Sequence, residues 1–348
     1  TNAVYHVRLF QFDKSVGGNI AYGEEINVFG KHAMIIANMS RRRVAFFVCD
    51  KLMSMKTLRE YVAEAVEKKV AIGHFNISNI EGFWAVVRAA EELSAAAGRG
   101  IPVIIGVSEG ERSFIGVSQA KALVESYIRE TGQPVFLNAD HTYSFDKVKE
   151  AADARYDSII YDGTEARFED NVSMTRKCVE YARSVNPDTL VEGELGFIGK
   201  SSRILAEIPA GVKISEEFLT KPDEAKKFVD MTGVDMLAPA VGNIHGMLSG
   251  GKDPALNINR IREISEAVKI PLVLHGGSGN SAGDFKAAID AGVAVIHVNT
   301  ELRVAFRNAL RRTLTDNPDE IAPYKIMKPS ISAMREVVTE KLKIFNKI

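Results

Sequence analysis

The sequence contains little cysteine, with only Cys49 and Cys178 among its 348 residues. Two cysteines are too few for the disulfide framework of a small secreted protein, which favours a reducing compartment. No apolar run approaches the roughly 20 residues that a membrane helix needs. The N-terminus also lacks the basic and then apolar pattern of a signal peptide. These absences predict a cytoplasmic protein with no membrane association.

The sequence has no excess of charge of either sign. It contains 44 Lys and Arg residues against 45 Asp and Glu residues, which gives a formal net charge of -1. Nucleic-acid-binding proteins usually carry a basic surface, so we expect no nucleic-acid partner. The hydrophobic content of 46% is ordinary for a soluble enzyme. The length allows one large domain or two small ones.

The first 52 residues lack a sustained hydrophobic period and contain scattered glycines. The chain does not begin with methionine, and Met53 lies just before the first clear helical pattern. Two interpretations remain open: a small accessory segment, or an extension upstream of a protein that begins near Met53. We therefore expect an N-terminal extension over residues 1–52 and a catalytic domain over residues 53–348.

Predicted strands and helices alternate from Met55 onward. Several predicted strands are continuous apolar runs, as expected for parallel strands covered by helices. Eight such units in about 250–290 residues predict a TIM (β/α)8 barrel, an α/β fold, with additional helices at the C-terminus. The predicted strands span residues 70–76, 102–108, 134–141, 158–163, 189–196, 235–242, 271–279 and 293–299.

The connections between these strands are predicted with less detail. One helix is expected from the second strand to about Glu130, and the final helix is expected over residues 329–346. Residues 197–216 show no clear period and are expected to form a long loop. A doubly wound open sheet is the alternative fold, but it usually has a glycine-rich loop after its first strand. The first strand here ends in HFNISN (74–79), which contains no glycine.

Polar residues follow the predicted strands at the end where active sites of such barrels lie. Four histidines occupy this position: His141, His245, His275 and His297. A single histidine there would more often be structural, but three from separate strands favour a shared function. Three neutral imidazoles with one open position form a catalytic zinc site, and other divalent metals also bind imidazole.

Two further loops predict a phosphate site. HGGSG (275–279) follows the seventh predicted strand, and VNTE (298–301) ends the eighth. These are the usual phosphate-binding loops of a TIM barrel. Glycines let backbone N–H groups approach an anion closely. The substrate is therefore expected to be phosphorylated. The strand ends contain no lysine, which disfavours a Schiff-base mechanism.

Seven segments, in order and spacing, resemble the class II, metal-dependent fructose-bisphosphate aldolases. The resemblance covers the chain from about Met55 to its end. It implies a lyase of glycolysis and gluconeogenesis that reversibly cleaves a ketose 1,6-bisphosphate, most simply fructose 1,6-bisphosphate, to dihydroxyacetone phosphate and glyceraldehyde 3-phosphate. It also implies a homodimer or homotetramer. The segments are GHFNISN, NADHTYS, SIIYDGT, VEGELG, AVGNIHGM, LVLHGGSG and VNTELR.

The resemblance also implies residue roles. His141, His245 and His275 match the ligands of Zn²⁺ or another divalent metal, which would stabilise the enediolate as a Lewis acid. Glu194 matches a glutamate that holds the metal in an alternative position, and Asp140 matches the acid–base group for the C4 oxygen. Some phosphate loops also hold a monovalent cation in family members. Substrate and phosphate contacts are expected from Asn76, Ser108, Gly246, Gly276, Gly277, Ser278, Asn299 and Thr300.

Three departures from the family pattern leave the substrate open. His297 replaces an asparagine that contacts the enediolate, and could either bond the same oxygen or become an extra metal ligand. Lys200 and Ser201 occupy the place of the glutamate that acts as the C3 base, which leaves Glu207 as the acid in that loop. PYKIMKP (323–329) stands where a phosphate-binding arginine is expected. Alternatives are therefore tagatose bisphosphate, another sugar phosphate, or a barrel that binds sugar phosphates without turnover.

Overall fold

The protein, described here by a computed structural model, forms two compact units over residues 1–55 and 56–348. The structure describes residues 4–10, 23–29, 56–199, 203–208, 212, 215–249 and 253–348. In the first unit, β1 (Val4–Phe10) and β2 (Gly23–Phe29) pair as antiparallel strands. The expected boundary at Met53 and the loop residues Lys200 and Ser201 lie outside the described residues.

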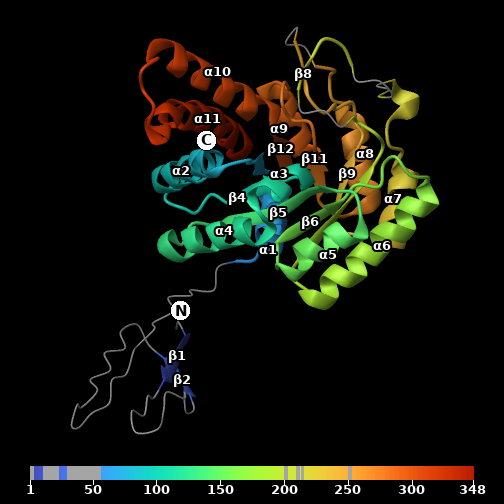
Figure 1. The fold of residues 1–348 in the computed structure, drawn as a ribbon. Coiled ribbons are helices and arrows are strands. Elements are labelled where there is room, and N and C mark those ends of the chain that lie inside the picture. Colours follow the sequence, from blue (N-terminus) through green and yellow to red (C-terminus); the bar gives the residue numbers. More distant parts are fainter. Residues whose placement is uncertain are drawn as a thin grey trace. The chain divides into compact units, whose positions relative to one another are not determined.

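The second unit is a closed barrel of eight parallel strands, which confirms the predicted fold class. Helices surround the strands in the ribbon view (Figure 1). The strands, in barrel order, are β3 (Ile72–Asn76), β4 (Val103–Val107), β5 (Val135–Thr142), β6 (Ser158–Tyr161), β7 (Leu190–Leu195), β9 (Met236–Pro239), β11 (Leu272–Leu274) and β12 (Val293–Val298). The helices are α1 (Leu58–Lys68), α2 (Ile80–Ala97), α3 (Glu109–Ile115), α4 (Val117–Thr131), α5 (Phe145–Asp153), α6 (Phe168–Val185), α7 (Pro222–Thr232), α8 (Ile258–Val268), α9 (Ala282–Asp290), α10 (Thr300–Asp316) and α11 (Pro323–Asn346).

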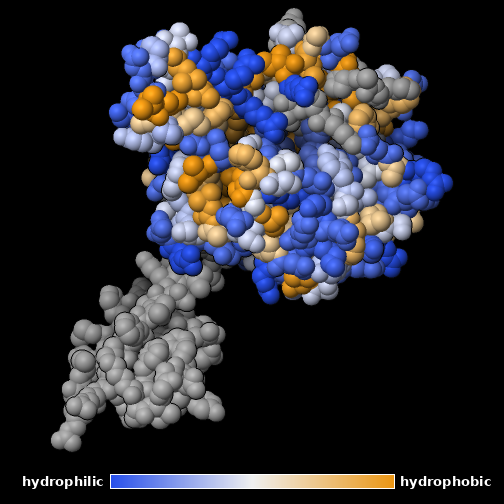
Figure 2. Space-filling model, in the orientation of Figure 1, coloured by the Kyte–Doolittle hydropathy of each residue, from blue (hydrophilic) through white to orange (hydrophobic). Residues whose placement is uncertain are grey.

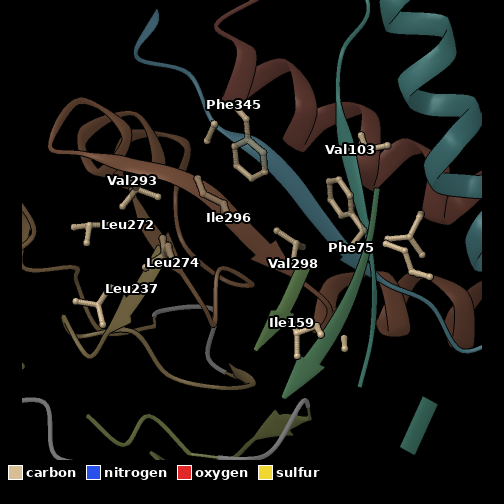
Figure 3. Close-up of a cluster of buried hydrophobic side chains, with 14 of the residues drawn as sticks. Phe75, Val103, Ile159, Leu237, Leu272, Leu274, Val293, Ile296, Val298 and Phe345 are labelled. Atoms are coloured by element: carbon tan, nitrogen blue, oxygen red, sulfur yellow. The ribbon is translucent and has the colours of Figure 1, made fainter. Parts of the chain in front are cut away.

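The core has an outer and an inner apolar cluster, because successive strand residues point to opposite faces. The outer cluster includes Phe75, Val298 and Phe345 from β3, β12 and α11, which Figure 3 shows near one another. The inner cluster contains Ile72 and Phe136 together with α1 side chains. The continuous apolar runs in the sequence arise because both faces of each strand are buried.

The barrel interior becomes polar toward the C-terminal ends of the strands. On β3, inward positions advance from Ile72 to His74 and then Asn76. The same step of two residues leads from Phe136 to Asn138 on β5. The inner cluster therefore supports a layer of buried polar side chains above it, and this layer positions the site.

Two predicted element boundaries in the first and last thirds of the barrel are wrong. The helix expected up to Glu130 is divided into α3 and α4 by Gly116, whose φ of +98° is incompatible with a continuing helix. The final helix was expected from residue 329, but α11 begins at Pro323 and contains Pro329. Proline normally marks a helix boundary because it has no N–H, and here the helix continues through it.

Two further predictions concern segments near the site. The strand expected over residues 271–279 ends at Leu274, and Gly276, with a φ of +61°, lies in the loop that follows. Within the segment expected to be a loop, β8 (Ile204–Leu205) pairs in parallel with β10 (Met247–Leu248). The 3-10 helix η1 (Glu216–Phe218) ends the same segment.

The surface of the barrel unit mixes polar and apolar residues. Its visible face is mostly hydrophilic, with apolar residues in separate patches (Figure 2). The most exposed large apolar side chains include Phe114, Ile321 and Tyr324. Among the described residues, no helix has the length and apolar character to cross a membrane.

Candidate metal centre and active site

Three histidines from separate parts of the barrel mouth come together. His141 lies in β5, His245 follows β9 and His275 follows β11. Each can offer one ring nitrogen to a group whose members lie within 4.8 Å of one another. The structure therefore brings the three histidines suggested by the sequence into one cluster.

A hydrogen bond fixes the outer nitrogen of each ring. His141 Nδ1 lies 3.1 Å from Asp162 Oδ2, and His275 Nε2 lies 2.8 Å from Glu192 Oε1, both within hydrogen-bond distance. His245 Nδ1 donates to the carbonyl of Gly199. When these partners hold the protons on the outer nitrogens, His141 Nε2, His245 Nε2 and His275 Nδ1 can bind a metal, which is the usual outer-shell arrangement of a histidine metal site.

The three inner nitrogens fit a divalent metal. His275 Nδ1 lies 3.2 Å from His141 Nε2. With the outer nitrogens protonated, both inner nitrogens carry lone pairs and are close enough to bind the same cation. Three neutral imidazoles with an open position match the donor set of catalytic zinc.

Two buried acids surround His141 and favour positive charge there. Glu194 Oε1 lies 2.9 Å from His141 Nδ1, and burial raises the pKa of Glu194 to about 7. Burial by itself lowers the pKa of His141, but Glu194 and Asp140 outweigh it and raise that pKa well above its usual value. Glu194 Oε1 also lies 3.8 Å from His275 Nδ1, so this oxygen faces two of the clustered rings.

Asp140 is a buried carboxylate beside this cluster. Its Oδ2 accepts a 2.8 Å hydrogen bond from Asn76 Nδ2, and its Oδ1 lies 3.5 Å from His297 Nδ1 and 3.8 Å from His141 Nε2. Burial alone would raise the pKa of Asp140, but the charge on His141 and the contact with His297 hold it well below its usual range. Asp140 is therefore ionised and can accept a proton next to the metal position.

His297 is the middle ring of a stack of three imidazoles. Its ring centroid lies 3.5 Å from that of His74 and 4.0 Å from that of His275. His74 and His297 are paired in register on β3 and β12, which places them side by side. Burial lowers the pKa of His297 to about 3, so this ring is neutral. His74 occupies space that Gly106 provides, since a Cβ there would lie 2.1 Å from the His74 ring.

The predicted phosphate loops line the same pocket as His141, His245 and His297, whereas His275 is buried beside it. Thr300 begins α10, so the positive dipole end of this helix faces the pocket and can favour an anion there. Gly276 has to be glycine, because a Cβ there would lie 2.1 Å from the carbonyl oxygen of Ile244. The predicted residues that line the pocket are Asn76, Asp140, His141, His245, Gly246, Gly276, Ser278, His297, Asn299 and Thr300.

Some predicted site residues have other surroundings. Ser108 caps α3 and donates to Glu111, and the backbone N–H of Gly277 donates to the carbonyl of His297. Glu207 is exposed and does not line the pocket. Lys325, considered for a distal phosphate, forms an ion pair with Glu320 at 2.9 Å.

Sequence reasoning did not assign roles to several residues that shape the site. Asp162 and Glu192 orient metal-site histidines, and Tyr143 lines the pocket. The spacing of Glu192 and Glu194 could have indicated that both point into the barrel, because residues two apart on a strand share a face. No sequence signal pointed to Arg112, whose guanidinium contacts β5 from α3.

Comparison with known proteins places this geometry in a family. The model of the family described as fructose-bisphosphate aldolase class-II matches residues 56–348. A fructose-bisphosphate aldolase from Geobacillus stearothermophilus is 37% identical over 299 residues, covering 84% of this chain and 97% of that protein. One from Staphylococcus epidermidis is 36% identical over 297 residues, covering 84% and 98%. The crystal structure of the YdjI aldolase from Escherichia coli K12 has a TM-score of 0.68 and 30% identity, covering 83% of this chain and 96% of that one.

Proposed function

The chain belongs to the class II fructose-bisphosphate aldolase family, and we propose that its substrate is fructose 1,6-bisphosphate. It is a metal-dependent aldolase, a lyase that acts on phosphorylated sugars. The observation that supports the substrate best is one pocket that joins an ionised Asp140, two of the three clustered histidines and the phosphate loop before α10. The named relatives with this substrate cover most of the chain.

We propose that Asp140 starts the cleavage by accepting the proton of the C4 hydroxyl group. As that proton leaves, the C4 oxygen forms a carbonyl, the C3–C4 bond breaks and its electron pair remains on the dihydroxyacetone phosphate half. His141, His245 and His275 would hold the metal, which would supply a Lewis acid for this developing charge. Asn76 holds Asp140 in place by a hydrogen bond to its Oδ2.

The C3 carbon must then be protonated, and we propose Glu207 for this step. Glu207 lies in the described segment 203–208 of the loop that follows β7, and this role requires the loop to close over the pocket when substrate binds. Neutral His297 is proposed to donate a hydrogen bond to the substrate oxygen that the family's asparagine would contact. Its position beside Asp140 Oδ1 supports this role.

The remaining properties are proposed at a coarser level. The donor set favours Zn²⁺ as the metal, with Glu194 as an alternative ligand. The loops around Ser278 and Asn299 are proposed to bind the C1 phosphate, and a monovalent cation is proposed to bind in the same loops. We propose a cytoplasmic homodimer or homotetramer, since exposed Phe114, Ile321 and Tyr324 provide apolar contact area. Residues 53–348 are proposed as the catalytic domain.

A substrate panel with zinc-loaded protein tests the proposed substrate. It should contain fructose 1,6-bisphosphate, tagatose 1,6-bisphosphate and fructose 1-phosphate at equal concentrations. We expect the highest kcat/KM with fructose 1,6-bisphosphate. Faster cleavage of tagatose 1,6-bisphosphate would select the C4 epimer as the substrate, and faster cleavage of fructose 1-phosphate would show that the second phosphate is not recognised. Binding of all three without cleavage would indicate a non-catalytic barrel.

A further inference from the structure

The most strained part of the site is the segment of β5 that carries Asp140 and His141. The ladder between β5 and β6 shifts register there, with Ala139 opposite Ile159 but Thr142 opposite Tyr161. Two residues of β5 thus oppose one of β6, which is a β-bulge. His141 has a φ of +36°, a left-handed conformation that side chains other than glycine rarely adopt.

The guanidinium of Arg112 donates hydrogen bonds to both sides of this bulge. Arg112 Nη1 donates to the carbonyl of Asp140 at 3.1 Å, and Arg112 Nη2 donates to Thr142 Oγ1 at 3.0 Å. Nη1 also donates to the carbonyl of Val107 at the end of β4. Arg112 therefore binds both sides of His141 and anchors them to the neighbouring strand.

Arg112 is suited to this task by its burial and its shape. It is only 3% exposed, and its planar fork can donate to three acceptors in fixed directions. Burying a guanidinium is costly, and burial lowers its pKa here. A residue needed only to fill space between α3 and β5 would not require these three directed bonds.

Glu111, which precedes Arg112 on α3, helps to orient the side chain of Asp140. Glu111 Oε2 accepts from Asn76 Nδ2 at 2.8 Å, and the same Nδ2 donates to Asp140 Oδ2. Glu111 also forms an ion pair with Arg303. Helix α3 thus orients the carboxylate of Asp140 through Glu111 and Asn76, and its backbone through Arg112.

We propose that Arg112 is a positioning residue for the metal centre, which holds the β5 bulge so that Asp140 and His141 face the metal together. This inference rests on the proposed function for its catalytic consequence, but its effect on metal binding does not depend on which sugar is cleaved. Strained backbone persists only where surrounding contacts maintain it. Removal of these bonds should let the segment relax and move His141 Nε2 away from the other two ligands.

The test compares Arg112→Lys with Arg260→Lys. Arg260 is also mostly buried and donates to two backbone carbonyls, those of Leu219 and Thr220, outside the site. Zinc affinity is measured without substrate, by competition with a chromophoric chelator. Thermal stability is measured on the same samples, as are the kcat and KM for fructose 1,6-bisphosphate. We expect Arg112→Lys to weaken zinc binding about 10–100-fold and to lower kcat with little change in KM. Arg260→Lys should leave zinc affinity and kcat unchanged.

Thr142 variants provide a second test that keeps the arginine. Thr142→Val removes one acceptor of Arg112 and should weaken zinc binding about tenfold, whereas Thr142→Ser retains the hydroxyl and should bind zinc as the parent does. If Arg112→Lys does not fold, this pair decides the outcome. Parental zinc affinity in both Arg112→Lys and Thr142→Val, or equal losses in Arg260→Lys, would overturn the proposal. Tight zinc binding by a parent that cleaves no sugar would instead contradict only the proposed function.

Discussion

At the residue scale, each imidazole of the metal site is oriented by a different partner. Asp162, Glu192 and the carbonyl of Gly199 each lie within hydrogen-bond distance of one outer ring nitrogen. This arrangement turns the other nitrogen of each ring toward the centre of the cluster. Asp140 differs from these acids because it contacts His141 Nε2 on the inner side, at 3.8 Å. Its position suits a proton acceptor for substrate rather than a support for a ligand.

Substitution of Asp140 separates proton transfer from metal binding. We expect Asp140→Ala to retain the metal but to lower kcat by about 10²–10⁴-fold, the usual contribution of an acid–base group. The measurement combines metal content with the rate of fructose 1,6-bisphosphate cleavage. Asp146→Ala, which removes an exposed acid from the first turn of α5, is the control and should behave as the parent. Turnover near that of the control would remove Asp140 from the mechanism.

Glu207 can be tested by a reaction that needs no cleavage. The enzyme should exchange the C3 proton of dihydroxyacetone phosphate with solvent, and we expect Glu207→Gln to slow this exchange by about 10²-fold or more. Glu217→Gln changes another exposed acid of the same long segment and should exchange normally. If Glu207→Gln exchanges as fast as Glu217→Gln, another group, such as His297, is the base.

At the element scale, α11 packs against the outer face of the barrel next to β3. Its residue Phe345 is fully buried, lies edge-on to Phe285 with ring centroids 5.2 Å apart, and accepts a backbone hydrogen bond from Ala71. The helix therefore completes the outer cluster and supports the strand that carries His74 and Asn76.

Truncation of this aromatic side chain should destabilise the barrel. Phe345→Ala should cost about 3–5 kcal/mol, because it leaves a cavity in a closely packed cluster. In a thermal melt the midpoint should fall by about 5 °C or more. Ile348→Ala changes a side chain that is 55% exposed at the same end of the chain and should shift the midpoint little. Equal midpoints for the two variants would show that α11 does not support the core as described.

The elements also show how far the sequence could predict the structure. The eight strands were recognisable because both faces of each are buried, which leaves apolar runs such as VIIGV in β4. The break at Gly116 and the early start of α11 were missed, because a glycine within a helical pattern and a proline are ambiguous local signals. Strand ends identified the pocket-lining histidines. The β5 bulge and its contacts with Arg112 could not be predicted, because they depend on packing between α3 and β5.

At the scale of the whole molecule, the family match and the compact barrel unit both begin at residue 56. The first helix of that unit has its own start signal, a capping box between Thr57 and Glu60. We therefore expect a protein that begins at Met53 to fold and to keep the kcat and KM of the full chain. Soluble expression, thermal melting and cleavage of fructose 1,6-bisphosphate are measured for both. Loss of solubility or of activity on truncation would show that residues 1–52 contribute to the enzyme.

The most direct measurement of the central claim is cleavage of fructose 1,6-bisphosphate before and after removal of the metal. The protein is dialysed against a strong chelator, its metal content is measured, and activity is assayed again after one equivalent of Zn²⁺ is added. We expect activity to disappear with the metal, to return with zinc, and not to return in His141→Ala. Full activity in the metal-free protein, or inactivation by borohydride in the presence of substrate, would contradict the claim.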